Sequence, residues 1–198
     1  RVDVESPAEE KPKAHYLQLN QSFIITTVKS GILLIDQHLA HTRVLFERFL
    51  KQLENGSGVS QQELFPQAVT LNLNDASLLK ELQSDLENLG FRLEQANPTT
   101  FMINGTPADT AGSDAVELLE KILEHCKINR SDLMLDRKLN LAQGMAAQVA
   151  MKAQTALCEA EMQNLVDQLF ACNVAELAPN GKKTYILLNT EELLSRLN

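Results

Sequence analysis

Four side chains close to residue 40 have the types and spacing that could bind a divalent metal ion. Asp36, His38 and His41 lie within six residues of one another, and Glu47 follows six positions later. Carboxylates and imidazoles are common metal ligands, and two histidines three residues apart share one face of a helix. The alternative is that Asp36 caps the helix and the histidines make local hydrogen bonds. The sequence nearby supplies no further ligands, so the spacing alone favours this structural interpretation.

A β-hairpin and a helix are the elements that must position these residues. Residues 22–28 are apolar and β-branched, a turn at 29–31 contains glycine, and residues 32–35 form a second apolar run. The second run is apolar on both faces, so we expect it to be buried. Asp36 then opens a helix with apolar residues at helical spacing, and the Gly/Ser segment 55–58 ends it.

The rest of the chain carries further strand and helix patterns. Asn74 or Asp75 is the expected cap of one helix, and Asn189, with Glu192 three residues on, is the expected cap of the last. The patterns predict strands at 16–19, 68–73, 91–95, 100–104 and 184–188, and helices at about 74–89, 114–126, 139–153, 162–170 and 191–197.

These elements predict an α+β fold in two parts. A mixed sheet packed with helices is expected over residues 15–73 and 131–198. A smaller α/β subdomain, residues 74–130, is expected to be inserted into it. Residues 1–14 contain prolines and many charges, so we expect them to be a disordered linker.

The composition excludes several classes of protein. The chain has 198 residues, of which 44% are hydrophobic, and no apolar run approaches the roughly 20 residues of a membrane span. The net charge of −8 argues against a separate nucleic-acid-binding module, since phosphates repel an acidic surface. Three widely spaced cysteines suit unpaired thiols in a reducing cytoplasm. The first residue is not Met, so we expect a fragment of a longer chain.

Residues 35–47, with the two preceding strands, resemble the C-terminal region of MutL DNA mismatch repair proteins. In members that nick DNA with the help of a metal ion, the motif here is D-Q-H-A-x-x-E-x-x-x-x-E. The chain keeps Asp36-Gln37-His38 and the last glutamate, Glu47. Leu39 replaces the alanine, and Thr42 replaces the first glutamate. The resemblance assigns that glutamate to metal binding, so its loss removes a carboxylate ligand.

Two other motifs of the nicking members have also lost side chains. In the stretch that resembles A-C-x-x-A-x-K, Ala147 replaces the cysteine and Gln148 stands where histidine is often found. In the stretch that resembles C-P-H-G-R-P, Ala178 and Asn180 replace the cysteine and the histidine, while the proline and glycine of the turn remain. The resemblance therefore implies a scaffold without nuclease activity or cofactor, in which Asp36, His38 and Glu47 are vestigial.

The resemblance also implies partners. It implies a homodimer whose two copies hold ATP-binding arms of the gyrase/Hsp90-like class upstream of the linker. Other mismatch repair proteins would be partners, DNA would be contacted weakly or through the full-length protein, and the location would be the bacterial cytoplasm, at the nucleoid during repair. A different function stays open: a divergent metal-dependent nicking endonuclease that uses Asp36, His38, His41 and Glu47.

Residues 61–66 are a second candidate site. Gln61, Leu64 and Pro66 fit the pattern Q-x-x-[L/I]-x-P, which resembles the sliding-clamp-binding motif of MutL proteins. We expect the segment to be a loop, in which Gln61 makes polar contacts at a pocket mouth. Leu64 and Phe65 would offer apolar surface, and Pro66 would limit the conformations lost on binding. The alternative is that Leu64 and Phe65 begin a buried strand.

Overall fold

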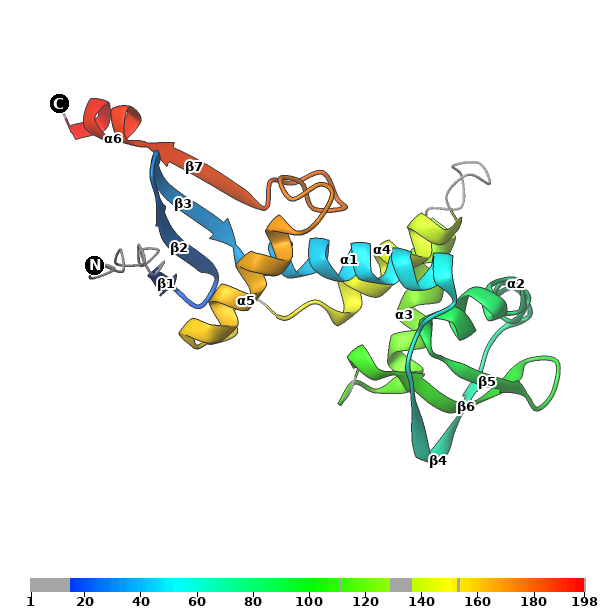
Figure 1. The fold of residues 1–198 in the computed structure, drawn as a ribbon. Helices are drawn as coiled ribbons and strands as arrows, with labels where there is room; N and C mark the ends of the chain where they lie inside the picture. The colour runs from blue at the N-terminus through cyan, green and yellow to red at the C-terminus, as the bar shows by residue number, and fades with distance from the viewer. Residues whose placement is uncertain (1–14, 111, 129–136, 153, 198) are drawn as a thin grey trace, which may run out of the picture.

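The computed structural model describes residues 15–110, 112–128, 137–152 and 154–197 of the chain. The expected linker at 1–14 and the expected boundary at residue 131 lie outside these residues. Two antiparallel sheets lie towards opposite ends of the long helix α1 (Gln37–Asn55), with further helices beside them (Figure 1). The expected α+β class is confirmed. None of the described helices is long and apolar enough to cross a membrane.

The first sheet has the strand order β1 (Tyr16–Leu19), β2 (Phe23–Val28), β3 (Gly31–Asp36) and β7 (Tyr185–Asn189). Its three pairings are all antiparallel, so the expected mixed sheet is wrong: β7 returns from the far end of the chain and runs against β3. Gly31 has a φ of 154°, and a Cβ there would collide with the backbone of β7. Glycine is therefore required where β7 approaches the hairpin.

Helix α1 begins and ends as its sequence predicts. The Asp36 carboxylate accepts a hydrogen bond of 2.9 Å from the Leu39 N–H, which satisfies one of the free donors of the first turn. At the other end Gly56 adopts a left-handed conformation, with a φ of 62°, and its N–H donates to the carbonyl of Gln52.

The second sheet has the strand order β4 (Ser60–Thr70), β6 (Thr100–Pro107) and β5 (Arg92–Gln95). Helix α2 (Leu73–Leu89) follows β4 directly. Its cap is Asn72, whose side chain accepts from the Asp75 N–H, and not Asn74 or Asp75. The expected cap is wrong because β4 ends at Thr70, so the chain turns into the helix earlier than its apolar pattern suggests.

Two hydrophobic clusters divide the interior. The larger joins the second sheet to α2, α3 (Ala115–Ile128), α4 (Arg137–Val149) and the C-terminal half of α1. The smaller lies between the first sheet, α5 (Glu159–Phe170) and the N-terminal half of α1. Strand β4 and helix α4 therefore pack with the larger cluster, whereas the expected division placed them in the part that contains the first sheet. The boundaries of that division stay predictions.

Helix α6 (Thr190–Leu197) follows β7 at the end of the chain. The Asn189 Oδ1 accepts a 2.7 Å hydrogen bond from the Glu192 N–H, so the expected cap is confirmed. None of the residues 190–197 is buried, and the helix projects from the rim of the first sheet (Figure 1).

Candidate functional site

The two histidines of the candidate metal site both contact the backbone of one residue, Met151. The His38 Nδ1 lies 2.8 Å from the Met151 carbonyl oxygen, and the His41 Nδ1 accepts a 2.9 Å hydrogen bond from the Met151 N–H. His38 must therefore carry its proton on Nδ1, while His41 must present a bare Nδ1. These contacts attach the segment after α4 to the first turns of α1.

The environment of His41 keeps its ring neutral. Burial, the positive charge of Arg48 and the neighbouring His38 together lower the pKa of His41 to about 4, against the opposing effect of Asp109. A neutral ring is also what the hydrogen bond requires, because a protonated Nδ1 cannot accept from the Met151 N–H.

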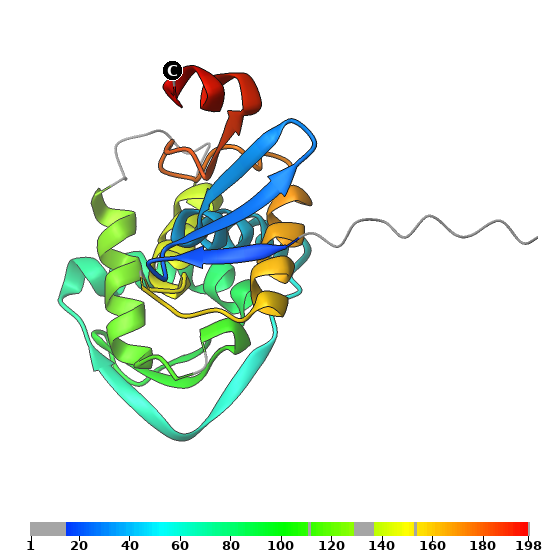
Figure 2. The ribbon, with the colours of Figure 1, turned by 90° about the vertical axis from the view of Figure 1, so that its left-hand side faces the viewer.

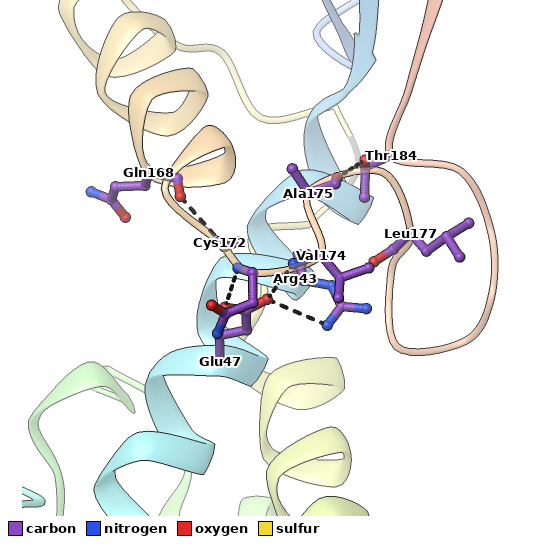
Figure 3. A network of polar contacts seen from close by, with 9 residues as sticks. Arg43, Glu47, Gln168, Cys172, Val174, Ala175, Leu177 and Thr184 are labelled. Atoms are coloured by element: carbon purple, nitrogen blue, oxygen red, sulfur yellow. Dashed lines mark hydrogen bonds and ion pairs between the residues drawn. The ribbon is translucent and has the colours of Figure 1, made fainter.

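The two carboxylates of the candidate site lie in separate contacts. Asp36 caps α1. The Glu47 carboxylate accepts hydrogen bonds of 2.8 Å from the Asn173 N–H and 3.1 Å from the Val174 N–H, and it lies 3.7 Å from the Arg43 guanidinium (Figure 3). Glu47 thus anchors the segment that follows α5 and does not converge with the histidines.

Arg43 fixes the next part of the same segment. Its Nε donates to the carbonyl of Leu177, and its guanidinium lies over the Phe46 ring at 5.2 Å from the centroid. Further on, the Thr184 hydroxyl donates to the carbonyl of Ala175, so the chain between α5 and β7 folds back on itself (Figure 3). Sequence reasoning missed Arg43, although an arginine among apolar residues in the middle of a helix is the kind of signal that could have revealed it.

The residues that differ from the nicking motifs are buried, exposed or hydrogen-bonded to nearby backbone. Ala178 is buried, with 2% of its surface exposed, and the Asn180 side chain accepts from the Lys182 N–H within the turn. The Thr42 hydroxyl donates to the carbonyl of His38, one helical turn earlier. Ala147 and Gln148 lie exposed on α4. Within the described ranges, no group of three or more His, Cys, Asp or Glu side chains could hold a metal ion.

The candidate docking segment, residues 61–66, lies in an irregular part of β4 and not in a loop. From Gln62 to Gln67 β4 advances five positions, while its partner β6 moves only from Gly105 to Ile103. Such a bulge leaves residues out of the ladder and re-aims their side chains. Leu64 and Phe65 are 91% and 84% exposed, so the alternative that they begin a buried strand is wrong.

The outer face of the first sheet is another feature that sequence reasoning missed. One row of cross-strand neighbours on this face is entirely apolar: Leu17, Ile25, Leu34 and Ile186. At the two edges of the sheet, Leu17 is 68% exposed and Ile186 is 43% exposed. In Figure 2 strands β1 to β3 lie nearest the viewer, in front of α1.

The sequence of strand β3 already indicated this apolar face. Its apolar residues on both faces led to the expectation of complete burial. Leu33 and Ile35 are buried against the smaller cluster, but Ile32 and Leu34 remain partly exposed. A strand that is apolar on both faces has two surfaces to cover, and the described chain covers one of them.

Comparisons with known proteins show the family of the chain. Residues 16–157 match the family model described as the MutL C terminal dimerisation domain. The chain is 35% identical over 189 residues to the DNA mismatch repair protein MutL of Chloroherpeton thalassium, 35% over 189 to that of Flavobacterium psychrophilum, and 36% over 185 to that of Christiangramia forsetii. These alignments cover 96%, 96% and 93% of the chain, but only 30%, 31% and 30% of the relatives. With most of its length matched by the family model, the chain belongs to the MutL C-terminal dimerisation domain family.

Proposed function

We propose that this chain is a non-catalytic homodimerisation domain of a DNA mismatch repair protein, which pairs through the outer face of its first sheet. The apolar row from Leu17 to Ile186 carries the proposal. A stable homodimer needs an apolar surface beyond the core of each copy, and a twofold axis lets one face cover its own copy. Burying an exposed leucine or isoleucine side chain completely is worth about 1.5–3 kcal/mol.

Helix α6 would take part in the same interface. It continues directly from β7, and Leu194 and Leu197 are 56% and 83% exposed. An eight-residue helix without a buried side chain gains little stability of its own, because most helical stability in proteins comes from packing. Contact with the second copy would supply that packing.

The contacts of the four candidate ligands support the absence of catalysis. His38 and His41 bind the Met151 backbone, Asp36 caps α1, and Glu47 binds two backbone N–H groups. In a nicking endonuclease with this ligand set, the Glu47 carboxylate would have to leave the two N–H groups that both of its oxygens bind. A plasmid-nicking assay with manganese tests this part of the proposal, and nicking that disappears in Asp36→Asn would contradict it.

The role in repair would be to couple two upstream ATP-binding arms. The chain spans about a third of the length of the curated relatives it matches, so the rest of the protein carries those arms in this proposal. Pairing of the C-terminal domains raises the effective concentration of each arm for the other. Other mismatch repair proteins would then act on the joined pair.

Residues 61–66 are the proposed docking site for the sliding clamp. The bulge presents Leu64 and Phe65 to solvent beside Pro66, whose ring reduces the conformational entropy lost on binding. Two neighbouring, almost fully exposed apolar side chains on an edge strand are the type of anchor that enters a partner's pocket.

Sedimentation equilibrium tests the dimer directly. The chain at micromolar concentrations is expected to have twice its monomer mass. A monomer over the whole range would remove the basis of the proposal.

A further inference from the structure

A hollow of about 320 Å³ lies on the second sheet beside the proposed docking bulge. Its lining residues are Ser60, Gln62, Arg92 and Asn104. Gly105 is the cross-strand partner of Gln62 on one side and of Arg92 on the other. Since Gly105 has no side chain, the space between these two long polar residues is left unfilled.

A buried hydroxyl group points at this space. The Ser60 Oγ would lie 2.7 Å from a Cβ built on Gly105, so it borders the position that the missing side chain leaves free. It is buried and has no hydrogen-bond partner among the described residues. An unpaired buried hydroxyl is costly, and this one is placed to donate to a group that enters the hollow.

Arg92 is held at the rim with part of its guanidinium free. One nitrogen, Nη1, makes long contacts of 3.4 Å to the Glu87 carbonyl at the end of α2 and 3.3 Å to the Phe91 carbonyl. Among the described residues Arg92 forms no ion pair. Its other N–H groups can therefore bind a planar acceptor, and a guanidinium matches a carboxylate in a two-bonded geometry.

The surrounding charge selects the ligand class. Ser60, Gln62 and Arg92 can all donate, which favours an acceptor with two oxygens. Glu94, which accepts from Asn104, and Glu63, which accepts from Thr106, make the rim acidic outside the hollow. A singly charged carboxylate fits this balance better than a phosphate, and the hollow has room for an acidic side chain.

We propose that the hollow between Gln62 and Arg92 binds a carboxylate, namely an acidic side chain of the protein that docks on residues 61–66. This proposal rests on the proposed docking function. Gln62 belongs to both features, because it lines the hollow and is the last paired residue before the bulge. A protein whose pocket receives Leu64 and Phe65 would therefore place its own side chains over the hollow.

Nuclear magnetic resonance tests the hollow with a probe that does not depend on docking. Sodium acetate is expected to shift the Arg92 Nε–H and Gly105 N–H signals saturably, while sodium chloride at equal ionic strength is not. Ser60→Ala and Arg92→Gln are each expected to weaken acetate binding at least fivefold, with Lys80→Gln, an exposed charge on α2, as the unaffected control. Shifts that do not saturate, or that chloride reproduces, would overturn the proposal.

Affinity for the purified sliding clamp tests the source of the carboxylate. Arg92→Glu is expected to weaken clamp binding at least tenfold, Lys80→Glu less than twofold, and Arg92→Lys by an intermediate factor. A double Leu64→Ala, Phe65→Ala variant reports on docking alone. If the double variant loses binding while Arg92→Glu keeps it, docking stands and this proposal fails. If the double variant binds normally, the docking function fails and the proposed source fails with it.

Discussion

The His41 Nδ1 accepts a 2.9 Å hydrogen bond from the backbone N–H of Met151, the residue whose carbonyl oxygen lies against His38. One peptide segment after α4 is thus held by two side chains on consecutive turns of α1. This contact occupies the Nδ1 of His41. It also makes the protonation state of His41 part of the fold.

The stability of the fold is expected to fall as the pH drops from about 6.5 to about 4. The ordinary pKa of 6.5 applies to His41 in the unfolded chain, and burial, Arg48 and His38 lower the pKa to about 4 in the fold against the opposing effect of Asp109. Between these values the unfolded chain binds more protons, so acid favours unfolding. The expected loss is about 2 kcal/mol once solvent screening is allowed for, and it is absent above pH 6.5.

Urea unfolding of the wild type and His41→Asn at pH 7 and pH 4.5 measures this effect. The Asn Oδ1 can accept from the Met151 N–H but does not titrate. The carboxylates are common to both proteins, so their contribution cancels in the difference. If the wild type and His41→Asn differ by the same free energy of unfolding at both pH values, His41 is not responsible for the loss of stability in acid.

Charge on the outer face of the first sheet is expected to separate the dimer. In Leu17→Glu and Ile186→Glu a carboxylate replaces an exposed apolar side chain, and pairing would bury that charge at a cost of several kcal/mol. The dimer dissociation constant is expected to rise at least a hundredfold in sedimentation equilibrium. Val59, which is 66% exposed beside the second sheet, provides the matched control Val59→Glu. Equal effects at Val59 and Leu17 would place the interface elsewhere.

Loss of the apolar residues of α6 is expected to weaken the dimer more than the fold. Leu194→Ser with Leu197→Ser removes two exposed leucines that make no buried contact in one copy. The dissociation constant is expected to rise at least tenfold, while the free energy of unfolding of the separated copies changes by less than about 0.5 kcal/mol. Glu191→Ser with Arg196→Ser changes the same helix without changing its apolar residues and serves as the control.

Local patterns in the sequence predicted the limits of α1 and the hairpin because their causes are local. Asp36 and Gly56 determine the ends of α1 through their own side chain and backbone, and both lie where the sequence places them. The bulge in β4 was predicted as a loop, because it arises from the pairing of residues 62–67 with β6 some 40 residues later. The contacts of Glu47 with residues 173 and 174 span a still longer separation, so spacing along α1 could not distinguish an anchor from a ligand.

Removal of the Glu47 carboxylate is expected to loosen the segment after α5 without any change in response to metal ions. Glu47→Ala leaves the Asn173 and Val174 N–H groups without their acceptor, which is expected to cost about 2 kcal/mol of the free energy of unfolding and to speed hydrogen exchange at both amides. Glu47→Gln keeps an acceptor oxygen and is expected to lose less. Manganese is expected to leave the unfolding temperature of all three proteins unchanged, since Glu47 acts as an anchor. A rise in the wild type that disappears in Glu47→Gln would instead identify Glu47 as a metal ligand and favour the nicking endonuclease.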